Sequence, residues 1–101
     1  MYAYIGQSIE LRCVVNETSG FTRIQHRLPN GSIETLLSNN KLNAELSRKS
    51  ELHIEKINNV YIVKIEPVRL HSAGMYICED DISSNNKASH NSNITLHVIG
   101  N

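Results

Sequence analysis

The sequence predicts an all-β protein that folds as a single antiparallel β-sandwich over residues 1–101. Three observations predict this fold class. Apolar residues recur at every second position in several short segments, Asn, Ser and Gly separate those segments, and the chain contains only two prolines. Alternation at period two is typical of strands that bury one face. Many short strands separated by turn residues favour a sandwich of two sheets, and 101 residues is the length of one domain.

The first half of the chain provides three predicted strands. In residues 9–15, apolar side chains share one face and mostly charged side chains share the other. Residues 24–28 continue the alternation and end at Pro29-Asn30-Gly31, which is a turn sequence. Residues 33–37 form a third short strand, and 42–46 are predicted to be irregular.

The second half provides four more predicted strands. Residues 51–55 alternate between charged and apolar side chains, and Asn58-Asn59 then forms a turn. Residues 61–65 follow as the next strand. Residues 74–81 and 94–98 complete the set, each with its apolar side chains in one phase.

The charge balance excludes two classes of partner. Ten Lys and Arg residues are matched by ten Asp and Glu residues, so the formal net charge is zero. A nucleic-acid-binding protein or a protein that binds anionic membranes usually carries a basic surface. No apolar run approaches the roughly 20 residues of a membrane-spanning helix. We therefore expect neither nucleic acid nor direct membrane insertion by this segment.

Cysteines and glycosylation motifs predict an extracellular location. Cys13 and Cys78 are too few for a zinc cage, and no histidine lies at metal-ligand spacing from them or from another histidine. A disulfide between them is the better hypothesis, and it implies an oxidising compartment. Asn16, Asn30 and Asn93 each begin an Asn-x-Ser/Thr motif and are candidate glycosylation sites.

The segment 63–78 carries a family resemblance. It is Val-Lys-Ile-Glu-Pro-Val-Arg-Leu-His-Ser-Ala-Gly-Met-Tyr-Ile-Cys, which closely resembles the immunoglobulin-superfamily pattern Leu-x-Ile-x-x-Val-x-x-x-Asp-Ser-Gly-x-Tyr-x-Cys. Tyr76 matches the tyrosine corner, whose hydroxyl ties the turn between strands E and F to the backbone. Gly74 suits a tight corner in which a side chain would collide. Residues 6–13 resemble the turn into strand B and its cysteine.

The resemblance implies an immunoglobulin-like sandwich with Greek-key topology, in which Cys13 and Cys78 bridge the two sheets. The interval between the cysteines leaves room for the extra C′ and C″ strands of a variable-type (V-set-like) domain. The first strand would begin at the A′ segment, residues 2–5.

Three departures from the family pattern mark this chain as divergent. The chain contains no Trp, and His26 takes the place of the strand C tryptophan. We expect His26 to be buried against the disulfide in its neutral form. Ser72 replaces the motif's aspartate, so the usual ion pair with an arginine, Arg48 by position, does not form. No Gly-x-Gly bulge precedes the last strand, which argues against pairing in the manner of antigen receptors.

No residue set predicts an enzyme, a cofactor or a metal site. Three carboxylates follow Cys78 and would raise the pKa of a free thiol, opposite to what thiol catalysis needs. His71 and Ser72 are adjacent in a corner without a cleft, so a hydrolase is not expected. The acidic run 79–81 fits a solvated loop better than a calcium site.

The remaining class of function is recognition of a partner by a surface. The alternation of side chains along the strands predicts which surface. Side chains of strands C, F and G that point away from the core mix basic, acidic and apolar groups on the G-F-C-C′ sheet. The predicted partner-binding residues are Arg23, Gln25, Arg27, Glu34, Ile77, Glu79, Asp81 and His97. Such a mosaic can complement itself about a two-fold axis, with Arg27 of one copy meeting Glu79 of the other.

The resemblance implies a function for this sheet, because variable-type cell-surface receptors usually dock through it. The first hypothesis is an extracellular adhesion or allorecognition module that binds a protein partner, including another copy of itself. The alternatives are a heterophilic immune receptor or secreted decoy, and a structural spacer within a longer ectodomain. The protein would be a disulfide-bonded glycoprotein, either secreted or the ectodomain of a cell-membrane protein. A glycan on Asn93 would lie at the edge of the docking sheet and move docking toward Gln25, Arg27 and Glu34.

Overall fold

A computed structural model describes residues 1–14, 21–38, 41–42, 51–58, 60–81 and 90–100. These residues form nine strands and one 3-10 turn. The elements are β1 (Tyr2–Tyr4), β2 (Ile9–Val14), β3 (Phe21–Arg27), β4 (Ile33–Ser38), β5 (Lys41–Leu42), β6 (Leu52–Ile57), β7 (Val60–Ile65), η2 (Leu70–Ser72), β8 (Gly74–Asp81) and β9 (His90–Ile99). Within these ranges, no helix is long and apolar enough to span a membrane.

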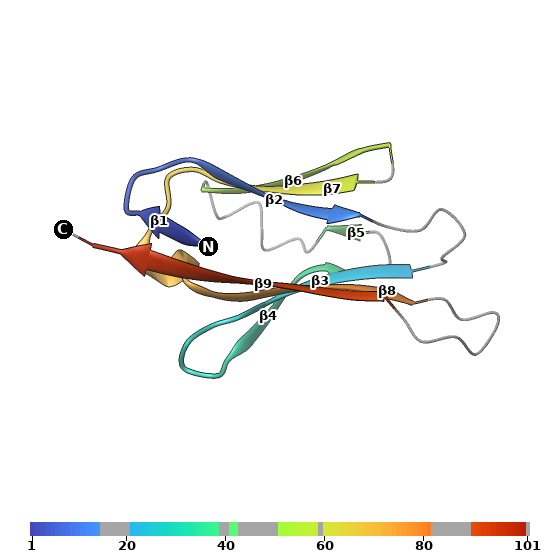
Figure 1. Cartoon of the computed structure of the whole chain (residues 1–101). Helices are drawn as coiled ribbons and strands as arrows, with labels where there is room; N and C mark the ends of the chain where they lie inside the picture. Colours follow the sequence, from blue (N-terminus) through green and yellow to red (C-terminus); the bar gives the residue numbers. More distant parts are fainter. Residues whose placement is uncertain (15–20, 39–40, 43–50, 59, 82–89, 101) are drawn as a thin grey trace.

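The strands form two sheets that pack as a sandwich (Figure 1). One sheet has six strands in the order β1-β9-β8-β3-β4-β5, and the other has three in the order β2-β7-β6. The chain passes from one sheet to the other between β1 and β2, between β2 and β3, between β5 and β6, and between β7 and β8. Both termini lie at the same end of the sandwich (Figure 1), because β1 pairs with the last residues of β9.

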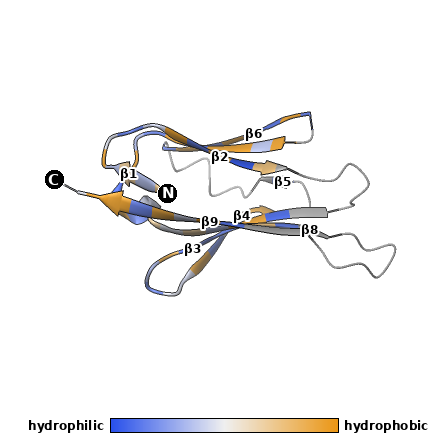
Figure 2. Ribbon diagram, in the orientation of Figure 1, coloured by the Kyte–Doolittle hydropathy of each residue, from blue (hydrophilic) through white to orange (hydrophobic). Residues whose placement is uncertain are grey.

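Alternating side chains build the core between the sheets. Hydrophilic and hydrophobic residues follow one another along the strands (Figure 2), so each strand turns one face inward. In β2, for example, Leu11 and Cys13 are buried while Glu10 and Arg12 are exposed. The largest fully buried side chains are Ile24, Leu36, Leu37, Ile65, Val68 and Leu96. They come from both sheets and from the segment before η2, so one core holds the sandwich together.

The expected turns take the backbone conformations that their residues favour. Residues 28–32 close the hairpin between β3 and β4, with Gly31 at a positive φ of 94° and the Leu28 N–H bonded to the Ser32 carbonyl. Asn58 follows β6 with a φ of 54°, a conformation that Asn tolerates better than most residues. The two hairpins therefore follow the turn residues of the sequence.

All seven predicted strands are present, and the all-β sandwich is confirmed. Two details differ from the expectation. β1 runs parallel to β9, with Ala3 opposite Val98, so the sandwich is not wholly antiparallel. Leu42, expected to be irregular, lies in β5; residues 43–46 lie outside the described part of the chain.

Candidate functional site

A disulfide joins the two sheets. Cys13 lies in β2 and Cys78 in β8, and their Cα atoms are 6.1 Å apart. Across the ladder between β3 and β8, Ile24 lies opposite Cys78. The residue of β3 beside the bridge is therefore Ile24, which is fully buried.

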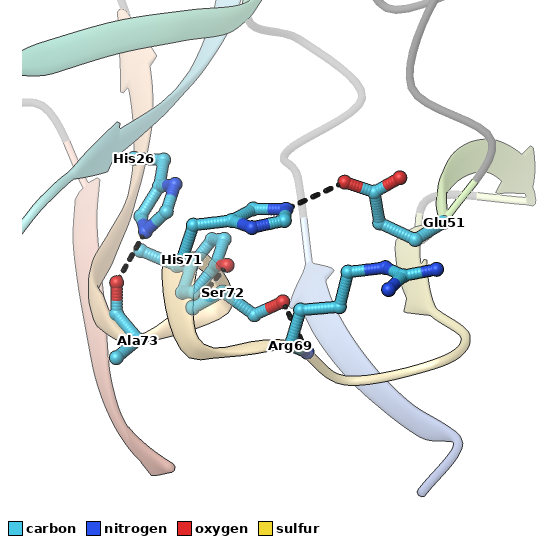
Figure 3. Close-up of polar contacts among 7 residues, drawn as sticks. His26, Glu51, Arg69, His71, Ser72 and Ala73 are labelled. Carbon is cyan, nitrogen blue, oxygen red and sulfur yellow. Dashed lines mark hydrogen bonds and ion pairs between the residues drawn. The ribbon is translucent and has the colours of Figure 1, made fainter. Parts of the chain in front are cut away.

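His26 is buried as expected, but one step further along the ladder. It lies opposite Tyr76 rather than opposite Cys78, and its ring stacks on the Tyr76 ring with centroids 4.2 Å apart. Its Nε2 is 2.7 Å from the Ala73 carbonyl oxygen (Figure 3). A carbonyl only accepts, so Nε2 donates this hydrogen bond. The expected position of His26 against the disulfide is thus corrected to a place against Tyr76.

Tyr76 and Gly74 shape the corner through which the chain enters β8. The Tyr76 hydroxyl donates a 2.6 Å hydrogen bond to the Ser72 carbonyl, as in a tyrosine corner. Burial, followed by the charges of Glu34 and Glu51, raises the pKa of Tyr76. Gly74 has a φ of 127°, and a Cβ at this position would overlap the carbonyl oxygen of Arg27. The corner therefore requires both residues.

An ion pair connects this corner to the start of β6. His71 Nε2 donates a 2.7 Å hydrogen bond to Glu51 Oε1 (Figure 3), and this bond is the main cause that lowers the pKa of Glu51. Beside it, the Ser72 hydroxyl accepts a hydrogen bond from the backbone N–H of Arg69. The sequence led us to expect no ion pair here because Ser72 replaces the aspartate. A hydrogen-bonded pair of His71 and Glu51 is present instead; Arg48 lies outside the described residues.

A small cavity lies between these groups. Its lining includes His26, Glu34, Glu51, His71 and Tyr76, and its volume is about 20 Å³. That is room for about one water molecule. Although acidic and imidazole groups meet here, the cavity cannot admit a substrate. In the part of the chain that the structure describes, no three His, Cys, Asp or Glu side chains are grouped so as to hold a metal ion.

The outer face of the six-stranded sheet consists of side chains that point away from the core. Residues directly opposite each other on neighbouring strands point to the same side. One row runs across four strands as Thr95, Met75, Arg27 and Ile33. The next row runs as Asn93, Ile77, Gln25 and Thr35. The register thus brings Gln25, Arg27 and Ile77 together, as the sequence predicted.

Arg23 and Glu79 lie opposite each other beyond these rows and form an ion pair. The predicted pairing of Glu79 with Arg27 of another copy would therefore compete with Arg23 for the same carboxylate. Arg27 is exposed, and no hydrogen bond or ion pair to its guanidinium occurs among the residues described here. Asp81 ends β8, but its side chain is outside the described set.

Glu34 does not belong to this outer face. It pairs with His26 across the ladder between β3 and β4, so its side chain lies on the inner side of the sheet, where it lines the small cavity. The predicted place of Glu34 on the outer face is therefore corrected. Its neighbours Ile33 and Thr35 occupy the outer face instead.

Exposed apolar side chains on the outer face were missed in the sequence. Tyr2 is 72% exposed, Tyr4 55%, Ile33 53% and Ile99 38%. The parallel pairing of β1 with β9 puts Tyr2 beside His97, and their rings stack with centroids 4.8 Å apart. The signal was present in the sequence as Tyr2-Ala3-Tyr4, an alternation whose two aromatic residues must face away from the core if Ala3 faces inward.

The outer face of the three-stranded sheet is charged. Glu10, Lys64 and His53 form one row across β2, β7 and β6. Lys64 pairs with Glu55 at 2.8 Å, and this hydrogen bond raises the pKa of Lys64. Arg12 lies exposed on the same face. Mixed charges in contact with solvent are typical of a face without a partner.

A groove opens at one end of the outer face of the six-stranded sheet. Its walls are residues 27–29 of the β3–β4 hairpin and 95–98 of β9, and its floor is residues 73–75 at the start of β8. The groove has a volume of about 490 Å³. It is called the hairpin groove below.

Two of the three glycosylation motifs are described. Asn93 is exposed on β9 beside Ile77, at the end of its row. Asn30 is exposed in the β3–β4 turn, where its Oδ1 accepts a hydrogen bond from the Ser32 N–H. Asn16 lies outside the described residues. A glycan on Asn93 would thus stand on the outer face, whereas a glycan on Asn30 would stand at the tip of the hairpin.

No protein-family model and no curated protein matches this chain.

Proposed function

We propose that this chain is a divergent, variable-type immunoglobulin-like module that works outside the cell and binds a protein partner through the outer face of the six-stranded sheet. The difference between the two outer faces carries this proposal. The three-stranded sheet shows rows of charged groups to solvent and one large exposed apolar side chain, Ile57, among the residues described. The six-stranded sheet shows four, Tyr2, Tyr4, Ile33 and Ile99, beside Arg23, Arg27 and Glu79. Exposed apolar and aromatic groups on one face favour a protein interface.

Three structural features support the immunoglobulin-like part of the proposal. The sheet orders β1-β9-β8-β3-β4-β5 and β2-β7-β6 correspond to A′GFCC′C″ and BED of variable-type domains. The Cys13–Cys78 bridge joins strands in the positions of B and F. The Tyr76 hydroxyl closes the corner before β8. An extracellular location agrees with the disulfide, which persists in oxidising compartments.

A second copy of the chain is the first partner to test, because an adhesion module of this kind often binds itself. The domain would be secreted from eukaryotic cells and studied by sedimentation over a wide range of concentration. In parallel, tetramers of the domain would be applied to cells that display candidate ectodomains. A recognition module is expected to self-associate or to bind one of these cell populations.

Two matched arginine variants then identify the face. Arg27→Glu reverses an exposed charge on the six-stranded sheet, and Arg12→Glu reverses one on the three-stranded sheet. We expect Arg27→Glu to weaken binding at least tenfold more than Arg12→Glu does. If wild-type protein neither self-associates nor binds any displayed ectodomain, the spacer hypothesis replaces the proposal. If it binds but both variants act alike, the proposed docking face is wrong.

A further inference from the structure

The hairpin groove lies at the end of the six-stranded sheet where β8 begins. It exists because the two neighbours of β8, namely β9 and the β3–β4 hairpin, extend beyond that point. β8 begins at Gly74, opposite Leu96, but β9 continues to Ile99. On the other side, the β3–β4 hairpin continues beyond β3 to Pro29. A notch therefore remains between β9 and the hairpin where the strand between them has not yet begun.

The lining combines an apolar surface with a cation. Leu28, Pro29 and Met75 contribute apolar atoms from the hairpin and β8. Arg27 stands on the hairpin side. A concave, mostly apolar site with a few polar groups is the usual form of a ligand-binding pocket, and about 490 Å³ lies within the usual size range.

The charge of Arg27 is unmatched, whereas that of Arg23 is matched. Both arginines belong to β3, point to the same face and are exposed. Arg23 pairs with Glu79, but no carboxylate among the described residues reaches Arg27. A guanidinium at the rim of an apolar groove is complementary to a carboxylate placed next to an apolar side chain.

We propose that the hairpin groove binds a segment of the partner protein in which a bulky apolar side chain is adjacent to a carboxylate. The apolar side chain fills the notch against Met75 and Pro29, and the carboxylate accepts hydrogen bonds from Arg27. The inference rests on the proposed function for the identity of the partner as a protein, but the groove can be tested without that partner.

The probe is a capped tetrapeptide, Gly-Leu-Asp-Gly, added to ¹⁵N-labelled domain with its disulfide intact. Backbone amide shifts of Gly74, Met75, Thr95 and His97 are expected to move and to saturate, while those of β6 and β7 stay constant. Capped Gly-Leu-Asn-Gly, which lacks the charge, and Gly-Ala-Asp-Gly, which lacks the bulky side chain, should each bind about fivefold more weakly.

Two arginine variants provide the matched control. Arg27→Gln should weaken the Gly-Leu-Asp-Gly complex about fivefold and remove its preference over the Asn peptide. Arg23→Gln, two residues away on the same face, should leave both unchanged, and dispersed amide spectra would show that each variant is folded. If peptide binding depends on Arg27 but Arg27→Glu leaves binding of the whole partner unchanged, the proposed docking face is wrong. The hairpin groove then remains a binding site for such a peptide.

Three results would overturn the inference. The first is an absence of saturable shifts at the groove. The second is equal binding of the Asp and Asn peptides. The third is saturable binding of Gly-Leu-Asp-Gly that Arg27→Gln leaves unchanged, since the carboxylate would then have no contact with this arginine.

Discussion

Tyr76 shows how one side chain can fix a corner of the fold. Its ring stacks on His26, while its hydroxyl donates to the Ser72 carbonyl four residues earlier in the chain. The ring thus holds β3 against β8, and the hydroxyl satisfies a carbonyl in the turn before β8. If a buried carbonyl loses its hydrogen-bond donor, the free-energy cost of removing that carbonyl from water is no longer offset.

We expect Tyr76→Phe to lower the free energy of unfolding by about 1–3 kcal/mol, because the Ser72 carbonyl is left without its donor. The ring and its stacking on His26 remain. Urea denaturation at neutral pH measures the change. Tyr4→Phe is the matched control, since Tyr4 is 55% exposed, and it should leave stability within about 0.5 kcal/mol. Equal effects of the two variants would contradict the structural role of the hydroxyl.

The same hydroxyl predicts how stability depends on alkaline pH. The folded pKa of Tyr76 lies above its ordinary value of 10.0, mainly because the phenolate would be buried. The contribution is therefore fully present below pH 10.0 and is lost as the pH rises toward the folded pKa. The fall in unfolding free energy above pH 10 should be smaller in Tyr76→Phe than in wild type. An unchanged slope would show that Tyr76 does not titrate with unfolding.

At the scale of elements, η2 is held to β6 by the pair of His71 and Glu51. His71 lies in the 3-10 turn η2, and Glu51 lies just before β6. Glu51 is only 13% exposed at its side chain, whereas His71 is 55% exposed. Solvent therefore screens the pair in part, and its contribution is limited to about 1 kcal/mol.

Glu51→Gln should remove an acid-sensitive part of the stability. The folded pKa of Glu51 lies below its ordinary value of 4.5, so its contribution is present above pH 4.5 and is lost as the pH falls through the folded pKa. Between neutral pH and about pH 3, wild type should lose up to about 1 kcal/mol more than Glu51→Gln does. Glu10→Gln, at an exposed carboxylate of β2, is the control and should follow wild type. Parallel curves for wild type and Glu51→Gln would contradict the role of the pair.

Strand positions could be predicted from the sequence, but the pairing between strands could not. Alternation placed β2, β7 and β8 well because each has one clear apolar phase. β4 is ambiguous, since Leu36 and Leu37 are adjacent and both are buried. A shift of register between Ile24 and Gln25 makes room for both. That shift also determines the neighbours of Glu34, which is why its predicted face was wrong.

At the scale of the molecule, the candidate site was predicted only in part. Alternation in β3 and β8 brought Arg27, Gln25 and Ile77 to one face, which the register bears out. The pair of Arg23 and Glu79 depends on which residues of two strands, far apart in the chain, lie opposite each other. The hairpin groove depends on where three segments end relative to one another. Local sequence patterns contain neither kind of information.

The Cys13–Cys78 disulfide cross-links the two sheets and spans a sequence separation of 65 residues. Loop closure of that size restricts the unfolded chain by about 4 kcal/mol. A domain of this length usually has a free energy of unfolding of about 5–15 kcal/mol, so the disulfide contributes a large part of it.

The double variant Cys13→Ala, Cys78→Ala should therefore lose about 4 kcal/mol of unfolding free energy in urea denaturation. Its m-value should rise because the unfolded chain expands. Wild type treated with a reductant is the control for packing changes at the two alanines, and it should lose a similar amount. A loss below about 1 kcal/mol in both samples would show that core packing alone holds the two sheets together.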